Sequence, residues 1–161
     1  MDWKKINENF NTYLKDLFHA EEWEQRAEAA REIGLMRDAR ATNLLCRALR
    51  TEDDHMVVNR IIEALGRIGD PKATTRVLEK LEEELDKFEG DKFRLVYILE
   101  ALTNLKDKRA LPKISSFLNS PDEDLKKLAI KAFDTIEPKW REIVEEEQKK
   151  KDIGDIFRKY R

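Results

Sequence analysis

Residues 57–81 constrain the fold more than any other stretch, because they predict two amphipathic helices joined by a tight turn. Apolar residues recur there at the i, i+3, i+4 and i+7 spacing of a helix with one apolar face, first as Val58, Ile61, Ile62, Leu65 and Ile68 and then as Ala73, Val77, Leu78 and Leu81. Between the two sets lie Gly69, Asp70 and Pro71. Glycine can take the left-handed conformation that ends a helix, aspartate can accept from the free N–H groups of the next helix, and proline suits its first turn. The stretch is therefore predicted to be a helical hairpin.

The turn of this hairpin recurs on both sides of it, which indicates a repeat. Residues 32–42 align without a gap with residues 64–74, and residues 100–102 and 107–110 align with 63–65 and 70–73. A weaker copy around Ala132 and Phe133 has a shorter turn at Glu137-Pro138, and Val144 continues its second helix. Copies of about 30 to 37 residues match the period of stacked α-solenoid units. The chain is therefore predicted to be a stack of about four hairpins.

Residues 2–18 precede the first hairpin and are predicted to form a helix that caps the stack. Their apolar residues fall at helical spacing, namely Trp3, Ile6, Phe10, Tyr13, Leu14 and Leu17. A terminal unit has to cover an apolar end, and aromatic side chains cover much area per residue. A helix on a membrane surface is the alternative, but Asp2, Glu8 and Asp16 offset the nearby lysines.

The second helix of the central hairpin is predicted to run past Leu81 to Gly90, because Leu85 and Phe88 continue its apolar face. The added turns either reach over a neighbouring hairpin or project an acidic ridge of Glu82, Glu83, Glu84 and Asp86. A solvated face is the simpler interpretation of that ridge.

Residues 62–73, IEALGRIGDPKA, resemble the signature of HEAT repeats, and specifically of the short HEAT-like repeats of phycobilisome lyases. The resemblance covers roughly residues 21–147. The third repeat departs from it, with Thr103 and Lys106 in place of Gly66 and Gly69. The resemblance implies an all-α fold, a right-handed, armadillo-like α-solenoid of about four HEAT-like hairpins with an N-terminal capping helix. Residues 1–20 would form the cap, 21–147 the solenoid, and 148–161 a charged tail with a short apolar motif.

Composition and charge restrict the partners and the location. Charged residues make up 41% of the chain, against about 25% in ordinary globular proteins, a bias typical of proteins from thermophilic prokaryotes. The net charge of −2 argues against a surface drawn as a whole to nucleic acid or anionic membrane. The N-terminus lacks the apolar core of a signal peptide, and no apolar run reaches the roughly 18 residues of a membrane span. We expect a cytoplasmic monomer or weak homo-oligomer.

Residues suited to catalysis or metal binding are few. A di-iron hydroxylase with HEAT-like repeats would need paired His-Glu dipeptides, and this chain has only His19-Ala20 and His55-Met56. Cys46 lies at the edge of an apolar face, has no histidine near it in sequence, and is interpreted as a small structural hydrophobe. The sequence therefore predicts no catalytic residue, no metal and no cofactor, and a protein that is not an enzyme.

A column of basic residues is the most informative polar pattern. Arg40, Lys72, Arg109 and Lys139 occupy equivalent positions just after the turn acids Asp38, Asp70, Asp107 and Glu137. In one interpretation the acids cap the second helices and the bases neutralise them. In the other, Arg47, Arg76 and Lys113 join the column in a basic stripe on the concave face, which the resemblance to HEAT repeats favours for binding.

The end of the chain carries a second candidate motif. Ile153, Ile156, Phe157 and Tyr160 fall at i, i+3, i+4 and i+7, the anchor spacing of a helix laid into a groove. The segment either docks on another protein or folds back to cover the last hairpin. Together these patterns predict a non-enzymatic scaffold that binds another protein through its concave groove, and through the tail in the docking case. The alternatives are bilin-lyase-like cofactor handling, implied by the resemblance, and nucleic-acid binding along the basic column.

Overall fold

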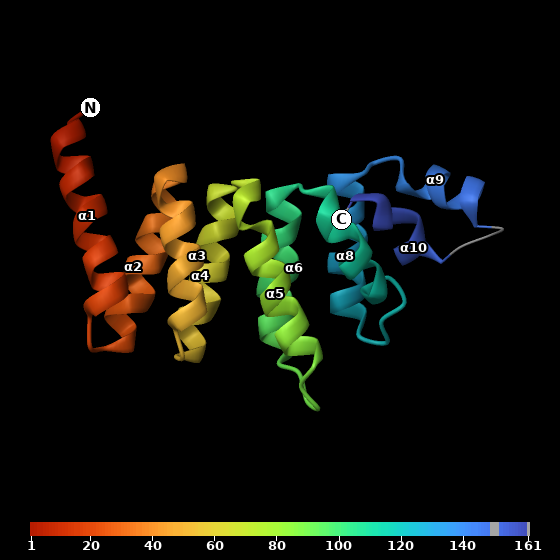
Figure 1. Cartoon of the computed structure of the whole chain (residues 1–161), viewed down its shortest axis with the longest axis horizontal. Helices are drawn as coiled ribbons and strands as arrows, with labels where there is room; N and C mark the ends of the chain where they lie inside the picture. The colour runs from red at the N-terminus through yellow and green to blue at the C-terminus, as the bar shows by residue number, and fades with distance from the viewer. Residues whose placement is uncertain (149–151, 161) are drawn as a thin grey trace. The chain divides into compact units, whose positions relative to one another are not determined.

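Helices and turns make up all the secondary structure of residues 1–148 and 152–160, which are the residues that the computed structural model describes (Figure 1). The predicted all-α, HEAT-like fold is confirmed. The chain divides into two compact units, Met1–Ala73 and Thr74–Arg161, and each is described by itself. The lysines at 149–151, part of the predicted charged tail, lie outside the described residues.

The first unit contains four α-helices and two short 3₁₀ helices: α1 (Trp3–His19), α2 (Trp23–Met36), η1 (Ala39–Ala41), α3 (Thr42–Thr51), α4 (His55–Ile68) and η2 (Pro71–Ala73). Helix α2 lies between α1 and α4, and α3 packs on α4 and η2. The approach of α2 to α4 is close, because a Cβ on Gly34 would lie 2.8 Å from the Cα of Ala64. Fully buried aliphatic side chains fill the space between these helices, namely Ile33, Leu45, Leu49, Ile61, Ile62 and Leu65.

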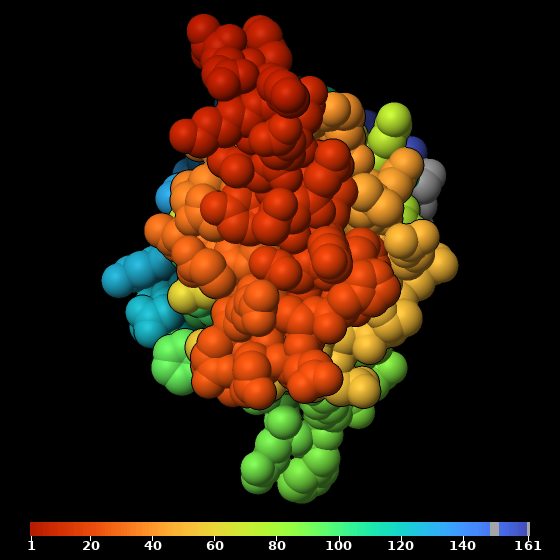
Figure 2. All heavy atoms as spheres, turned by 90° about the vertical axis from the view of Figure 1, so that its left-hand side faces the viewer, coloured from red at the N-terminus to blue at the C-terminus, as the bar shows by residue number. Residues whose placement is uncertain are grey.

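Helix α1 covers the outer side of α2, as predicted for a cap, and Figure 2 shows it in red across the N-terminal side of this unit. Phe10 and Leu17 are its buried residues, and Asp2 caps its first turn by accepting from the N–H of Lys5. Trp3, which the spacing assigned to the apolar face, is exposed. Helix α1 therefore covers α2 with residues from its middle and its C-terminal end, and not with its first turn.

The turns after the first helices follow one scheme in three repeats. Helices α2 and α4, and helix α6 (Lys92–Leu105) of the second unit, each end in a left-handed residue, respectively Arg37, Gly69 and Lys106. The next residue is an aspartate whose carboxylate accepts the N–H two residues on, at 2.9 Å for Arg40, 3.0 Å for Lys72 and 3.0 Å for Arg109. The predicted left-handed Gly69 is thereby confirmed, as is the capping by three of the four turn acids, Asp38, Asp70 and Asp107.

The second unit contains, besides α6, α5 (Thr74–Leu85), η3 (Lys108–Ala110), α7 (Leu111–Ile114), η4 (Ser115–Phe117), α8 (Glu123–Ile136), α9 (Trp140–Glu147), α10 (Ile153–Phe157) and η5 (Arg158–Tyr160). Helix α6 packs on α5 and on α8, α7 contacts α8, and α10 lies on α7. The second helix of the third repeat is short, a single α-helical turn that continues as 3₁₀ helix.

Helix α5 ends at Leu85, so the predicted continuation to Gly90 is wrong. The reason is Glu84, whose side chain is only 2% exposed. Its carboxylate accepts from the Lys87 Nζ at 2.7 Å and from the Asp91 N–H at 2.6 Å, so it holds both ends of a loop in place of another helical turn. Burial alone would raise the pKa of Glu84, but these two hydrogen bonds, together with the charges of Lys87 and Arg94, outweigh it and hold the pKa below its ordinary value. The loop projects beyond the ends of α5 and α6 (Figure 1) and leaves Phe88 fully exposed.

Candidate functional site

Several residues of the predicted basic column pair with acids or lie over aromatic rings. The Arg40 guanidinium pairs with Asp38 and lies over the Phe10 ring, with its Cζ 4.8 Å from the ring centroid. Arg109 pairs in the same way with Asp107 at 2.6 Å, and Arg47 lies over the Phe18 ring. The hydrogen bond from the Arg40 side chain holds the pKa of Asp38 below its usual range, as expected of a carboxylate beside a fixed cation.

The remaining members of the column are distributed over both units. Lys72 is an exposed residue of η2, Lys139 is the exposed residue before α9, and Arg76 of α5 pairs with Glu79. Glu137, predicted to be a capping acid, instead accepts from the Lys108 Nζ at 2.7 Å. The binding role of these residues stays a prediction.

Two column residues do line a common groove, with a volume of about 410 Å³, between α5 and the start of α7. Arg109 and Lys113 contribute the bases, while Glu79 and Glu82 face them from α5. The Lys113 Nζ lies 2.6 Å from a Glu82 carboxylate oxygen. This groove therefore presents paired charges, since acids of the same unit match both Arg109 and Lys113.

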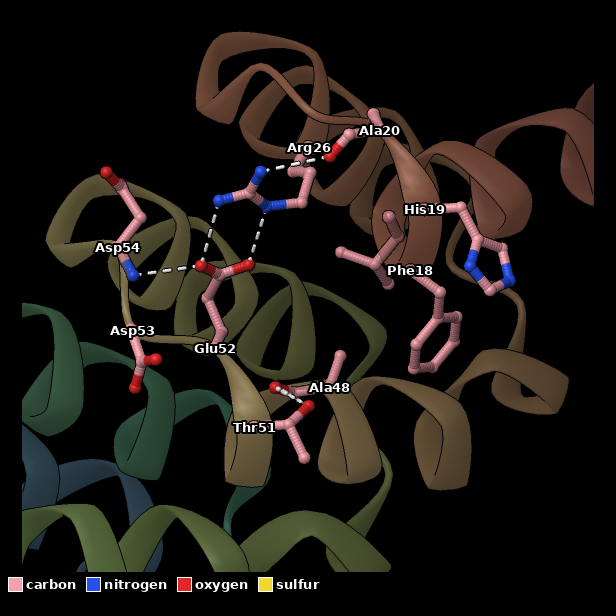
Figure 3. A pocket seen from close by; sticks show the side chains of 10 residues that line it. Phe18, His19, Ala20, Arg26, Ala48, Thr51, Glu52, Asp53 and Asp54 are labelled. Carbon is pink, nitrogen blue, oxygen red and sulfur yellow. Dashed lines mark hydrogen bonds and ion pairs between the residues drawn. The ribbon is translucent and has the colours of Figure 1, made fainter.

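A polar hollow of about 330 Å³ lies where the α1–α2 turn meets the end of α3 (Figure 3). Arg26 of α2 binds Glu52 through both nitrogens of its fork, Nε to Oε2 at 2.9 Å and Nη2 to Oε1 at 3.2 Å, and it also donates to the carbonyls of Ala20 and Glu21. Glu52 in turn accepts the N–H of Asp54 at 2.9 Å. The hydrogen bond to Glu52 raises the pKa of Arg26. These groups satisfy one another's hydrogen bonds, so the hollow is a structural lock, meaning that its ion pair fixes the α1–α2 turn to the turn after α3.

His19 lines the same hollow on the side away from the ion pair (Figure 3). Within residues 1–148 and 152–160, no group of three or more histidine, cysteine or acidic side chains is arranged to hold a metal ion. Nor is any described helix both long and apolar enough to cross a bilayer.

A larger open groove runs between α6 and α8 and has a volume of about 660 Å³. Phe93 and Val96 of α6 and Leu128 of α8 form its floor, and the Phe93 side chain is 74% exposed. Exposed apolar surface of this kind, rimmed by charge, is typical of binding sites. We call this surface the α6–α8 groove.

Lysines line the edge of the α6–α8 groove. Lys92 is held by Asp122 at 2.9 Å and Asp124 at 2.8 Å, and these contacts raise its pKa. Lys127 and Lys131, one turn apart on α8, have no acidic partner among the described residues. The rim therefore offers two exposed lysines to an approaching acid.

The α6–α8 groove continues toward the end of α6 as a narrower, more polar hollow. Leu128 and Lys131 line both parts, and Glu100, Thr103 and Asn104 line the continuation. From Phe93 to Asn104 the groove follows about 16 Å of helix at 1.5 Å per residue. Sequence reasoning missed this site. A signal was present in α6, because its apolar residues Phe93 and Val96 do not belong to the buried face formed by Ile98, Leu99, Leu102 and Leu105.

The candidate tail motif packs on its own unit. Ile156 and Phe157 are buried, and the Phe157 ring meets that of Phe133 edge-on with centroids 5.4 Å apart. Tyr160 stacks beside Phe157, and Ile153 is half-buried. This is the covering role that the sequence analysis gave as one of two alternatives.

Comparisons with known proteins support the resemblance to HEAT-like repeats. Residues 12–88 match the family of HEAT repeats. Over 99 residues, 61% of the chain, the sequence is 31% identical to the bilin biosynthesis protein PecE of Nostoc sp. (strain PCC 7120 / SAG 25.82 / UTEX 2576). The matched stretch covers 36% of that relative, so the chain spans about a third of its length. The thermophilic origin stays a prediction.

This relative contradicts one expectation from the sequence. The prediction of a protein that is not an enzyme is wrong, because the relative is a protein of bilin biosynthesis. The error arose from looking only for familiar catalytic and metal-binding side chains, which are a poor guide when repeats of one fold serve different functions.

Proposed function

We propose that the chain is a scaffold that binds another protein, and that the α6–α8 groove receives a segment of that partner. One observation carries the proposal: an open apolar floor of Phe93, Val96 and Leu128 lies beside two lysines with no acidic partner among the described residues. The match of residues 12–88 to HEAT repeats supports it, because stacked repeats present extended binding surfaces.

The chemistry of the groove defines the partner segment. Its floor favours an aromatic or aliphatic anchor, because covering the exposed Phe93 removes apolar area from water. Lys127 and Lys131 favour acidic residues next to that anchor. A length of about 16 Å accommodates roughly three turns of helix or a short extended segment.

Capture of partners by two matched variants tests the proposal. Lys127→Glu combined with Lys131→Glu reverses the charge of the rim, while Lys4→Glu combined with Lys5→Glu makes the same change on the exposed side of α1. Proteins retained from an extract of the source cells by the wild type and by the α1 variant, but lost with the groove variant, are the expected result. Retention of the same proteins by both variants would refute the proposal.

A second candidate function is the handling of a bilin, which the identity to a bilin biosynthesis protein favours. Bilins are open-chain tetrapyrroles with an apolar conjugated body and two propionate groups, and the α6–α8 groove offers an apolar floor and two lysines. Its volume of about 660 Å³ falls within the usual range of small-molecule sites.

Titration with biliverdin, followed by visible absorbance, tests this second function. We expect a saturable change of the long-wavelength band that the variant with Lys127→Glu and Lys131→Glu loses. A spectrum that remains equal to that of the free pigment at all protein concentrations would exclude it.

A further inference from the structure

We propose that the acidic loop after α5 docks, through Phe88, into the α6–α8 groove of a second copy of this chain. This inference rests on the groove that the proposed function assigns as a binding surface. It names an occupant that the chain itself supplies, and it makes self-association a competitor of partner binding.

The loop is built to present one aromatic side chain. Phe88 is fully exposed. The buried Glu84 carboxylate holds the loop at both ends, through Lys87 and the Asp91 N–H. At Gly90 a Cβ would lie 3.2 Å from the Glu84 carbonyl oxygen, so the backbone also packs closely there. A fixed loop loses little conformational freedom on binding, which favours association.

The charges beside Phe88 complement the rim of the groove. Asp86 and Glu89 flank the aromatic residue and make no ion pair among the described residues, whereas Lys87 is engaged by Glu84. The groove offers Lys127 and Lys131, equally without acidic partners in the described part of the chain. The loop thus offers two acids around an aromatic anchor, and the groove offers two lysines beside an apolar floor. Complementary charges of this kind fix how two partners align in an interface.

The contact is heterologous, because loop and groove are different surfaces of the same chain. Such head-to-tail contacts need no symmetry axis and form rings or open chains according to the angle between copies. A single Phe anchor buries only about 150–250 Å², far less than a stable interface. Self-association is therefore weak and concentration-dependent.

Complementation between two variants tests this arrangement. Phe88→Ser removes the anchor and leaves the groove, whereas Lys127→Glu combined with Lys131→Glu impairs the groove and leaves the anchor. Sedimentation velocity from about 10 μM to about 1 mM covers the range of weak interfaces. The wild type is expected to associate, with at least tenfold weakening in either variant alone and recovery of a one-to-one complex when the two variants are mixed. Trp3→Ser, which removes another exposed aromatic residue, is the matched control and leaves association unchanged.

Each contrary outcome overturns the inference in a recognisable way. Association that survives the groove variant shows a different contact, such as Phe88 against Phe88. Association lost in both variants and not restored by mixing excludes a head-to-tail contact. A wild type that stays monomeric, while the groove variant still loses its captured partners, refutes self-docking and leaves the proposed function intact.

Discussion

Replacing Arg26 with methionine is expected to destabilise the Met1–Ala73 unit by about 3 kcal/mol. The Arg26 and Glu52 side chains are only 18% and 10% exposed, so solvent does little to replace their contacts. Hydrogen bonds between charged groups contribute about 1.5–3 kcal/mol, and the two carbonyls that Arg26 also binds add about 1 kcal/mol. For a chain of 161 residues, 3 kcal/mol corresponds to a melting temperature lower by roughly 6–12 °C.

A double-mutant cycle separates the ion pair from the rest. Arg26→Met, Glu52→Leu and the double variant are compared by urea unfolding, followed through the far-ultraviolet helical signal. We expect a coupling energy of about 1.5–3 kcal/mol, because each single variant leaves one partly buried charge without its partner, whereas the double variant leaves none. Arg26→Met should be the more harmful single change, since it also leaves the Ala20 and Glu21 carbonyls without a donor.

The control is an exposed pair in the same unit. Arg31 and Glu28 lie one turn apart on α2, with side chains 44% and 60% exposed, and the same substitutions there should give a coupling below about 0.5 kcal/mol. If the Arg26–Glu52 coupling is no larger than that of this pair, the hollow in Figure 3 is not a structural lock, and its charges are available for another role.

Three further predictions concern stability. Arg37→Gly and Lys106→Gly should each stabilise by about 0.5–1 kcal/mol in urea unfolding, because glycine removes the cost of the left-handed conformation, whereas Gly69→Ala should cost about 1 kcal/mol. Phe157→Ala should cost about 3–4 kcal/mol, and an unchanged unfolding midpoint would show that α10 contributes nothing to its unit. Stability should be constant above about pH 5 and fall below about pH 4, because carboxylates whose pKa lies below the unfolded value stabilise only while ionised, and acid titration of the helical signal checks this. These carboxylates, in which burial is outweighed by hydrogen bonds, are those of Glu63, Glu84 and Asp107.

Local features of the fold could be predicted because their causes lie within a few residues. The left-handed Gly69, the capping by Asp70 and the pairing of Asp38 with Arg40 all depend on side chains one to three positions apart. Arg37 and Lys106 are also left-handed, although neither is glycine. Both stand opposite Gly69 in the repeat alignment, so the alignment predicts their conformation better than their residue type does.

Features that depend on distant contacts were missed. The end of α5 is set by Glu84, whose hydrogen bond reaches seven positions along the chain to Asp91, and no periodicity of apolar residues contains that information. The α6–α8 groove arises because two first helices lie side by side with Phe93 left uncovered. Its existence follows from how two helical faces meet, which the sequence of either helix alone does not specify.

The distribution of paired and unpaired charge decides which face can recognise a partner. An acid approaching Arg109 or Lys113 has to compete with Asp107 or Glu82, which already lie 2.6 Å from those bases, so it exchanges one ion pair for another. An acid approaching Lys127 or Lys131 displaces no ion pair of the described residues and gains the adjoining apolar floor as well. This difference supports the proposed binding role of the α6–α8 groove, because Asp107 and Glu82 already neutralise Arg109 and Lys113.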